Sequence, residues 1–362
     1  MKKIRVLVVE DSMTVRNRIL DILSAEPLIE VVGEAGDGKR GIELCLETRP
    51  DVITMDMMLP VMSGLAATEY IMAHCPTPIL VVSASMNRGE LFKIYEALAA
   101  GAVDVLEKPI GTEADDAWER RLVATVKLVA KIRVITHPRG RLAALGARRP
   151  PVEAPALDLR RTGRRYELVA IGASTGGPGA ILEVLRGLPA EFRLPILLVL
   201  HINEPFGSAF ADWLDGQTER PVTHASDGMP LRAAIGRVVM APGDRHLVVR
   251  DGVLRLTRDP ERHSCRPSVD VLFESVAADY GAAAAACLLT GMGRDGALGL
   301  LKIRQAGGLT IAQDESTSVV YGMPREAAML GAATLVLRLG DIGPRLAALE
   351  SAGSERLAEA HA

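Results

Sequence analysis

LVAIGASTGGPGA, residues 168–180, is an apolar run of strand length that leads directly into a glycine-rich turn and then into a helix-compatible stretch. Gly172 to Gly176 fit the pattern G-x-S-x-G, which on a strand-to-helix turn exposes a serine as a nucleophile. Two other interpretations stay open for these residues taken alone: a structural turn, which the pattern by itself favours, and a phosphate-binding loop. The segment fits neither G-x-G-x-x-G nor a P-loop, because no lysine follows.

The sequence around this segment predicts a doubly wound, mostly parallel α/β domain over residues 166–350. Apolar runs at 195–201, 236–242 and 284–292 are strand-like, and a helix is expected from about Gly177 to Arg186. RHLVVRDGVLRLTR, residues 245–258, predicts a β-hairpin insertion that turns at Asp251-Gly252. Residues 351–362 are expected to be a flexible tail.

A serine nucleophile needs a general base, and two further predicted strands lead to suitable residues. His201 ends the run 195–201, and Asp295 lies in the glycine turn that follows 284–292. Because the carboxyl ends of parallel strands share one edge of a sheet, both side chains can meet Ser174 there. Taken singly, His201 is more simply a hydrogen-bonded histidine and Asp295 a turn residue. The chain order Ser, His, Asp also differs from the Ser, acid, His order of α/β-hydrolases.

Residues 1–132 are predicted to form a separate flavodoxin-like (βα)5 domain. Short β-rich runs alternate there with helical stretches, which is typical of a parallel sheet with right-handed crossovers. The expected strands are 4–9, 29–35, 51–56, 78–84 and 102–108, and the expected helices lie near 13–25, 38–48, 64–74, 89–100 and 117–132.

Chemically reactive side chains follow four of these five strands. They are Glu10, Asp11, Asp56, Ser83 and Lys108. Clustered carboxylates repel one another unless a cation lies among them, and Mg²⁺ takes oxygen ligands of this kind. An aspartate beside Mg²⁺, with a lysine and a serine to contact phosphoryl oxygens, can become an aspartyl phosphate. Each residue alone would be a cap or a surface charge; the set indicates a phosphorylation site.

Residues 133–165 differ from both halves, with nine arginines and four prolines. We interpret them as an Arg/Pro-rich linker that is solvated or contacts an acidic protein. Binding to nucleic acid is less favoured, because the segment has no interleaved aromatic residues and no recognition-helix pattern.

The composition favours a globular protein outside the membrane. The net charge is −3, and no apolar run approaches the ~20 residues of a membrane span. The N-terminal apolar run is too short for a signal peptide. The four cysteines are far apart and form no C-x-x-C pair, so the sequence indicates neither a zinc site nor a disulfide framework.

The motifs VVED, MDMMLP, VVSAS and EKP resemble the receiver domain of bacterial response regulators over about residues 3–125. The resemblance implies that a CheA-type histidine kinase phosphorylates Asp56. It also implies the contacts of this site: Glu10, Asp11 and Asp56 for Mg²⁺, and Ser83 and Lys108 for the phosphoryl group. The chain departs from the family pattern at Glu10, where an aspartate is usual, and at Val105, where many receivers have an aromatic residue.

The motifs VAIGASTGGP, LVLHI, CRPSVDVLFESVA and LLTGMGRDGALGL resemble the catalytic domain of the chemotaxis protein-glutamate methylesterases, the CheB family, over residues 166–348. The resemblance implies that Ser174 is the nucleophile, His201 the general base and Asp295 the residue that orients it. Thr175 would lie beside His201, and the Met292 backbone N–H would form part of the oxyanion hole. Ester hydrolysis would need no cofactor. The usual HMP is His201-Ile202-Asn203 here, which bears on the fit of substrate.

The implied substrates are glutamate γ-methyl esters of methyl-accepting chemotaxis receptors, hydrolysed to glutamate and methanol for sensory adaptation, with some receptor glutamines deamidated by the same route. The implied location is cytoplasmic, at membrane receptor arrays. The unphosphorylated receiver would cover the active site. Two alternatives remain: a DNA-binding response regulator that uses the basic linker, and a signalling module without catalytic activity.

Overall fold

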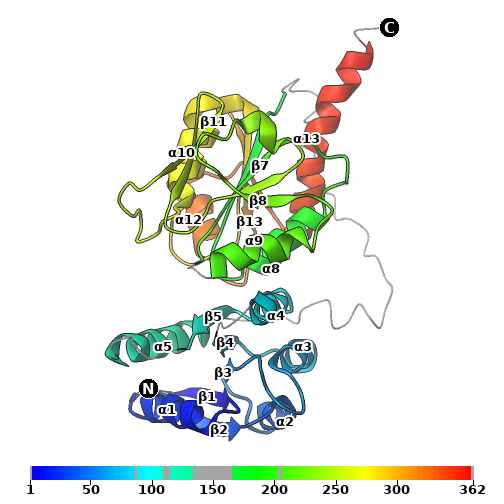
Figure 1. The fold of residues 1–362 in the computed structure, drawn as a ribbon. Helices are drawn as coiled ribbons and strands as arrows, with labels where there is room; N and C mark the ends of the chain where they lie inside the picture. Colours follow the sequence, from blue (N-terminus) through cyan, green and yellow to red (C-terminus); the bar gives the residue numbers. More distant parts are fainter. Residues whose placement is uncertain are drawn as a thin grey trace. The chain divides into compact units, whose positions relative to one another are not determined.

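The computed structural model describes residues 2–84, 88–108, 115–132, 134, 165–202 and 206–359. The chain divides into two compact units, Met1–Arg148 and Arg149–Ala362, and each contains a sheet flanked by helices (Figure 1). Nearly all of the predicted linker, residues 133–165, lies outside the described residues, so the prediction for it stays a prediction.

The N-terminal unit is a five-stranded parallel sheet in the order β2-β1-β3-β4-β5, which confirms the predicted (βα)5 fold. Helices α2, α3 and α4 cover one face, and α1 and α5 pair on the other. The strands are β1 Ile4–Val9, β2 Ile29–Ala35, β3 Val52–Met55, β4 Ile79–Ser83 and β5 Asp104–Glu107; the helices are α1 Met13–Ser24, α2 Gly38–Thr48, α3 Gly64–His74, α4 Arg88–Ala99 and α5 Asp115–Val129.

Local sequence explains where these helices begin. Ser12, Asp37 and Ser63 are extended residues whose side chains accept a hydrogen bond from a backbone N–H of the first turn of α1, α2 and α3. Each cap follows directly on a strand-end loop. The helices therefore start at the edge of the sheet where Glu10 and Asp56 lie.

The C-terminal unit is a seven-stranded parallel sheet in the order β14-β13-β12-β6-β7-β9-β8. Its strands are β6 Leu168–Ala173, β7 Ile196–Leu200, β8 Val222–His224, β9 Val238–Met240, β12 Ala284–Leu288, β13 Leu309–Gln313 and β14 Leu335–Leu337. The predicted hairpin is confirmed as a separate antiparallel pair, β10 His246–Arg250 and β11 Val253–Thr257, which packs beside α10.

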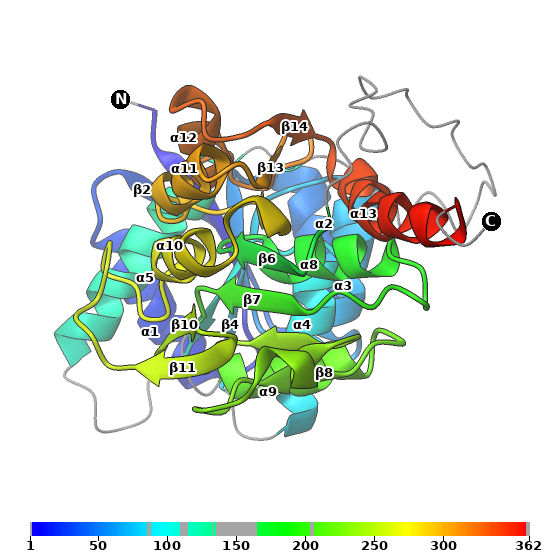
Figure 2. The same ribbon diagram turned by 90° about the horizontal axis from the view of Figure 1, so that it is seen from above.

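Helices cover both faces of this sheet, as Figure 2 shows: α10, α11 and α12 lie on one side, and α8 and α13 on the other. Their bounds are α8 Gly177–Arg186, α9 Phe206–Asp215, α10 Val269–Asp279, α11 Ala297–Gln305, α12 Met323–Met329 and α13 Leu339–Glu359, with short 3₁₀ turns at Leu231–Ala234 and Gly281–Ala283. Helix α13 continues to Glu359, into the segment 351–362 that is expected to be a flexible tail; its flexibility stays a prediction. Among the described residues, no helix is long and apolar enough to cross a membrane.

The central strand β12 carries three alanines, Ala284 to Ala286, all fully buried. Small side chains on this strand let α10 and α11, which both contact it, lie close to the sheet. At the neighbouring strand β6, a Cβ on Gly172 would come within 2.2 Å of Val269 Cγ1. The start of α10 thus approaches the sheet as closely as a glycine permits.

We expect Gly172→Ala to lower the free energy of unfolding by about 1–3 kcal/mol, the usual cost of overfilling a packed core. The added methyl group would push Val269 and the first turn of α10 away from β6. Differential scanning calorimetry should show a lower midpoint for this variant. Gly216→Ala is the matched control, because its Cβ would meet nothing closer than 3.5 Å; an equal loss in both variants would contradict the close approach.

Candidate active site

Three strand ends of the C-terminal unit bring the predicted residues to one edge of the sheet. Ser174 follows β6, His201 follows the neighbouring β7, and the turn that contains Asp295 follows β12 on the other side of β6. Backbone bonds fix this arrangement: His201 N donates to Ala173 O (3.1 Å), and Ser174 N donates to Thr290 O (3.0 Å). The predicted convergence of these strand ends is confirmed.

This edge is also where the sheet changes winding direction. From β6 the chain proceeds toward β7, β9 and β8, whereas β12, β13 and β14 extend on the opposite side. In sheets of this kind, ligands bind at the carboxyl ends of the strands where the winding direction changes, which here is between β6 and β12. Ser174 is half-buried at this position.

The turn around Ser174 is shaped by two glycines. Gly176 has φ 76°, and a Cβ there would come within 2.5 Å of Val319. From the neighbouring strand end, Gly291 approaches so closely that its Cβ would lie 2.8 Å from the Cβ of Ser174. The serine therefore lies against the backbone of residues 290–292, where only small residues fit.

Asp295 is held at the N-terminus of α10. Its carboxylate accepts hydrogen bonds from Ser268 Oγ (2.8 Å), Val269 N (2.7 Å) and Asp270 N (3.1 Å), and the side chain is almost completely buried. Helix N-termini stabilise negative charge, because their N–H groups and dipole point toward it. A buried, ionised Asp295 is thereby compensated.

The imidazole of His201 lies between two partners. Nε2 is 2.8 Å from Asp295 Oδ2, and Nδ1 is 3.7 Å from Cys265 Sγ. Burial lowers the pKa of His201, but the bond to Asp295 and the contact with Cys265 raise it, and the resulting pKa is about 9. Burial raises the pKa of Asp295, whereas the bonds from His201, Ser268 and Val269 hold it below its ordinary value. Both shifts favour an imidazolium–carboxylate pair.

The structure brings His201 and Asp295 into direct contact, but it does not connect Ser174 to them by a hydrogen bond. Within the described part of the chain, Ser174 Oγ has no hydrogen-bond partner, and its carbonyl accepts from Gly177 N (2.7 Å). Catalytic hydrogen bonds are often long in ligand-free enzymes and shorten when substrate binds. With Nε2 bonded to Asp295, Nδ1 is the nitrogen that remains for Ser174.

Thr175 follows Ser174 in its turn, and Met292 follows Gly291, which packs against the serine. In the described ranges, the N–H of Met292 donates no hydrogen bond, and its side chain is half exposed. A backbone N–H without a partner beside Ser174 can stabilise an oxyanion. Thr175 makes no hydrogen bond to His201; its carbonyl accepts from Thr290 Oγ1 (3.0 Å). Residues 203–205, which continue the altered loop after His201, lie outside the described residues.

The N-terminal unit also brings its predicted residues together. Lys108 Nζ lies 2.8 Å from Glu10 Oε2 and 3.0 Å from Asp56 Oδ2, and both carboxylates are buried. Burial raises the pKa of Glu10, the bond from Lys108 lowers it, the charge of Asp56 raises it, and the net change is upward. Burial lowers the pKa of Lys108, but its two carboxylate partners raise it above the ordinary value.

The donor set at this edge suits a divalent cation. One ligand oxygen from each of Glu10, Asp11 and Asp56 lies within 4.8 Å of the other two, and Asp11 is exposed to solvent. Three carboxylate oxygens with access for water are the kind of ligand set that Mg²⁺ takes. Beside them, the fully buried Ser83 Oγ has no hydrogen-bond partner among the described residues, so its hydroxyl can contact a phosphoryl oxygen.

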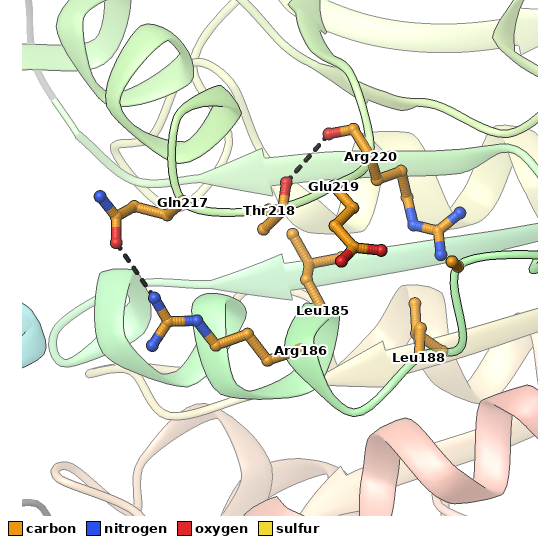
Figure 3. A pocket seen from close by; sticks show the side chains of 8 residues that line it. Leu185, Arg186, Leu188, Gln217, Thr218, Glu219 and Arg220 are labelled. Atoms are coloured by element: carbon orange, nitrogen blue, oxygen red, sulfur yellow. Dashed lines mark hydrogen bonds between the residues drawn. The ribbon is translucent and has the colours of Figure 1, made fainter.

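A pocket elsewhere in the C-terminal unit is not part of this site. It lies between the C-terminal end of α8 and the segment before β8, and Arg186 and Gln217 bond across it at 3.0 Å (Figure 3). Ser174 lies just before the start of α8, whereas Arg186 is at the end of that helix, and Arg220 lies just before the start of β8. The pocket is therefore at the opposite edge of the sheet from the serine.

Comparisons with known proteins identify related families for both units of the chain. Residues 169–346 match the family model of CheB methylesterases, and residues 6–115 match that of response regulator receiver domains. A protein-glutamate methylesterase/protein-glutamine glutaminase of Anaeromyxobacter dehalogenans is 44% identical over 94% of this chain and 95% of its own. Proteins with the same description are 42% identical in Nitrosospira multiformis, over 95% and 96%, and 43% identical in Myxococcus xanthus, over 95% and 96%. These matches set aside a DNA-binding output domain.

We expect His201 to titrate near pH 9, and Asp295→Asn to lower that pKa, because burial of the imidazole remains while its charged partner is lost. NMR titration of the ring nitrogens measures both. Since the folded pKa lies above the ordinary 6.5, this pair stabilises the fold fully below about pH 6.5 and loses its contribution as the pH rises through about 9. Asp227→Asn, which alters only a bond to Leu256 N, is the control and should leave the His201 titration unchanged.

Proposed function

The chain belongs to the protein-glutamate methylesterase/protein-glutamine glutaminase family and is a carboxylic ester hydrolase with a receiver domain, and from this premise we propose that Ser174, His201 and Asp295 form its catalytic triad. The single observation that carries the proposal is the 2.8 Å bond between His201 and a buried Asp295, on a strand end next to that of Ser174.

The proposed substrate is a glutamate γ-methyl ester on a methyl-accepting chemotaxis receptor. The neutral form of His201, which is the minor form at neutral pH because the pKa is about 9, takes the hydroxyl proton through Nδ1 as Ser174 Oγ attacks the ester carbonyl. The protonated imidazole then gives its proton to the departing methoxy group, which leaves as methanol. Water, deprotonated by the same nitrogen, attacks the acyl-serine; the products are free glutamate and regenerated Ser174.

Asp295 supports this cycle by holding the imidazole in one orientation and stabilising its protonated form. The hydroxyl of Ser268 and two backbone N–H groups at the start of α10 donate hydrogen bonds to the carboxylate. These bonds keep it ionised and hold it in one position. The N–H of Met292 supports the oxyanion of the tetrahedral intermediate, a contribution of about 3–4 kcal/mol in comparable hydrolases. Glutamine side chains follow the same route, with ammonia in place of methanol.

We expect Ser174→Ala to lower the rate of methanol release from methylated receptor membranes by about 10⁶-fold, because the attacking atom is lost. Ser226→Ala, which removes an exposed serine from the same unit, is the matched control and should keep the wild-type rate. Methanol release by Ser174→Ala at an undiminished rate would overturn the assignment.

The receiver unit is proposed to control the esterase through phosphorylation of Asp56 by a CheA-type histidine kinase. Glu10, Asp11 and Asp56 would hold Mg²⁺, which neutralises charge on the phosphoryl group when bound. Lys108 and the hydroxyl of Ser83 would contact the phosphoryl oxygens. Phosphorylation would shift the population away from a closed form in which the receiver covers the active site, and so permit adaptation at receptor arrays in the cytoplasm.

Asp56→Asn should abolish stimulation of methanol release by a small phosphodonor such as acetyl phosphate and leave the basal rate in place, since the amide cannot accept a phosphoryl group. The measurement compares the rates with and without phosphodonor in the presence of Mg²⁺. Asp21→Asn changes an exposed carboxylate of α1 and should be stimulated as the wild type is. Equal stimulation of Asp56→Asn and wild type would contradict the proposed control.

A further inference from the structure

Cys265 lies beside the catalytic pair although it is 64 residues away from His201 in the chain. It ends a tight turn, in which Arg262 and Cys265 exchange backbone hydrogen bonds of 3.1 and 2.9 Å. His263 and Ser264, at the tip of the turn, both have positive φ values, 53° and 60°. The backbone of this turn is strained, so the surrounding structure must hold it in place.

Two side-chain contacts anchor the turn to α10. Arg262 forms a bidentate pair with Glu274, at 2.7 and 2.8 Å, and His263 Nε2 lies 3.1 Å from the buried carboxylate of Asp270. Bidentate Arg–carboxylate pairs fix geometry as well as charge. Because α10 also holds Asp295, one helix positions both the thiol of Cys265 and the carboxylate behind His201.

The separation of the thiol and the imidazole matches that of two ligands on one zinc ion. Sγ of Cys265 and Nδ1 of His201 are 3.7 Å apart. With Zn–S of about 2.3 Å and Zn–N of about 2.0–2.1 Å, a tetrahedral angle places sulfur and nitrogen about 3.6 Å apart. The distance between the two atoms is therefore compatible with a shared metal ion.

Asp295 is placed as the outer carboxylate of a metal-bound histidine usually is. Metal-bound histidines usually donate their other ring N–H to a carboxylate, and His201 Nε2 has Asp295 Oδ2 at 2.8 Å. One ligand atom of each of these three residues lies within 4.8 Å of the other two. A thiolate and an imidazole favour Zn²⁺ over Mg²⁺, which takes oxygen ligands.

We propose that Cys265 Sγ and His201 Nδ1 form an inhibitory binding site for Zn²⁺ in the active site, with Asp295 as the outer carboxylate and solvent in the remaining positions. Binding releases the thiol proton and, where the imidazole is protonated, the proton on Nδ1, and the metal then occupies the Nδ1 lone pair of His201. The consequence for activity rests on the proposed triad: an imidazole whose Nδ1 is bound to metal cannot take the proton of Ser174.

Zinc binding is tested directly on the full-length protein by competition with a chromophoric chelator. Millimolar Mg²⁺ is present so that the carboxylates around Asp56 are occupied. We expect one zinc site, weakened at least 100-fold in Cys265→Ala; loss of an outer-shell partner alone typically costs ~10–100-fold. Cys45→Ala, which removes a buried thiol of the other unit, is the matched control and should bind zinc as the wild type does.

A second readout identifies the ligand. Co²⁺ in place of Zn²⁺ should give a thiolate-to-cobalt charge-transfer band in the wild type and in Cys45→Ala, but not in Cys265→Ala or Cys265→Ser. Equal zinc affinity in wild type and Cys265→Ala, or a cobalt band that survives in both Cys265 variants, would overturn the proposed site.

Activity then separates the two proposals. Zinc should inhibit methanol release by the wild type, and EDTA should restore it; each Cys265 variant, compared with its own zinc-free rate, should be insensitive at the same concentration. Absence of activity without zinc would refute the proposed function and leave the binding result to decide the metal site. Full activity at saturating zinc in the wild type would refute inhibition.

Discussion

The carboxylate of Asp295 accepts four hydrogen bonds, from His201, Ser268, Val269 and the N–H of Asp270. An isolated buried carboxylate would be strongly destabilising, so these contacts are a condition for the charge to exist at this position. They also join three parts of the fold: the turn after β12, the end of β7 and the start of α10. Orientation of the general base and docking of a helix thus depend on one side chain.

The N-terminal unit also stabilises buried carboxylate charge, but with a charged side chain instead of backbone N–H groups. There two buried carboxylates, Glu10 and Asp56, are compensated by the ammonium group of Lys108. Lysine is a compact charge on a flexible stem, so it can move when a phosphoryl group or a cation arrives. Asp295 is held mainly by backbone groups and is suited to remain fixed, whereas the receiver cluster is suited to exchange partners.

Much of both sites could be predicted because parallel strands align their carboxyl ends. Ser174, His201 and Asp295 each follow a strand with a clear apolar signal; Asp56 also follows such a strand, and Ser83 is the last residue of one. The prediction was weaker for short or atypical elements. The strands β8, β13 and β14 were not predicted; β8 and β14 have three residues each and lie at the edges of the sheet, too short for a periodic pattern.

The position of Cys265 could not be predicted from the sequence for a different reason. It depends on a turn with positive φ values and on the pairs that Arg262 and His263 make with α10, none of which leaves a periodic pattern. The sequence therefore indicated no zinc site, because ligand spacing along the chain is the only signal available there. The proximity of Cys265 to His201 results from tertiary structure alone.

Two alanines of β12, Ala284 and Ala286, face α10 and make the catalytic unit sensitive to substitution in its interior. They set the distance of α10 from the sheet, and α10 carries the donors that fix Asp295 and the turn that carries Cys265. A larger side chain at Ala284 or Ala286 would lift the helix by a fraction of an ångström without reaching any reacting atom. In a mutational survey, substitutions at these positions would lower catalytic activity, although the substituted residue lies entirely in the interior.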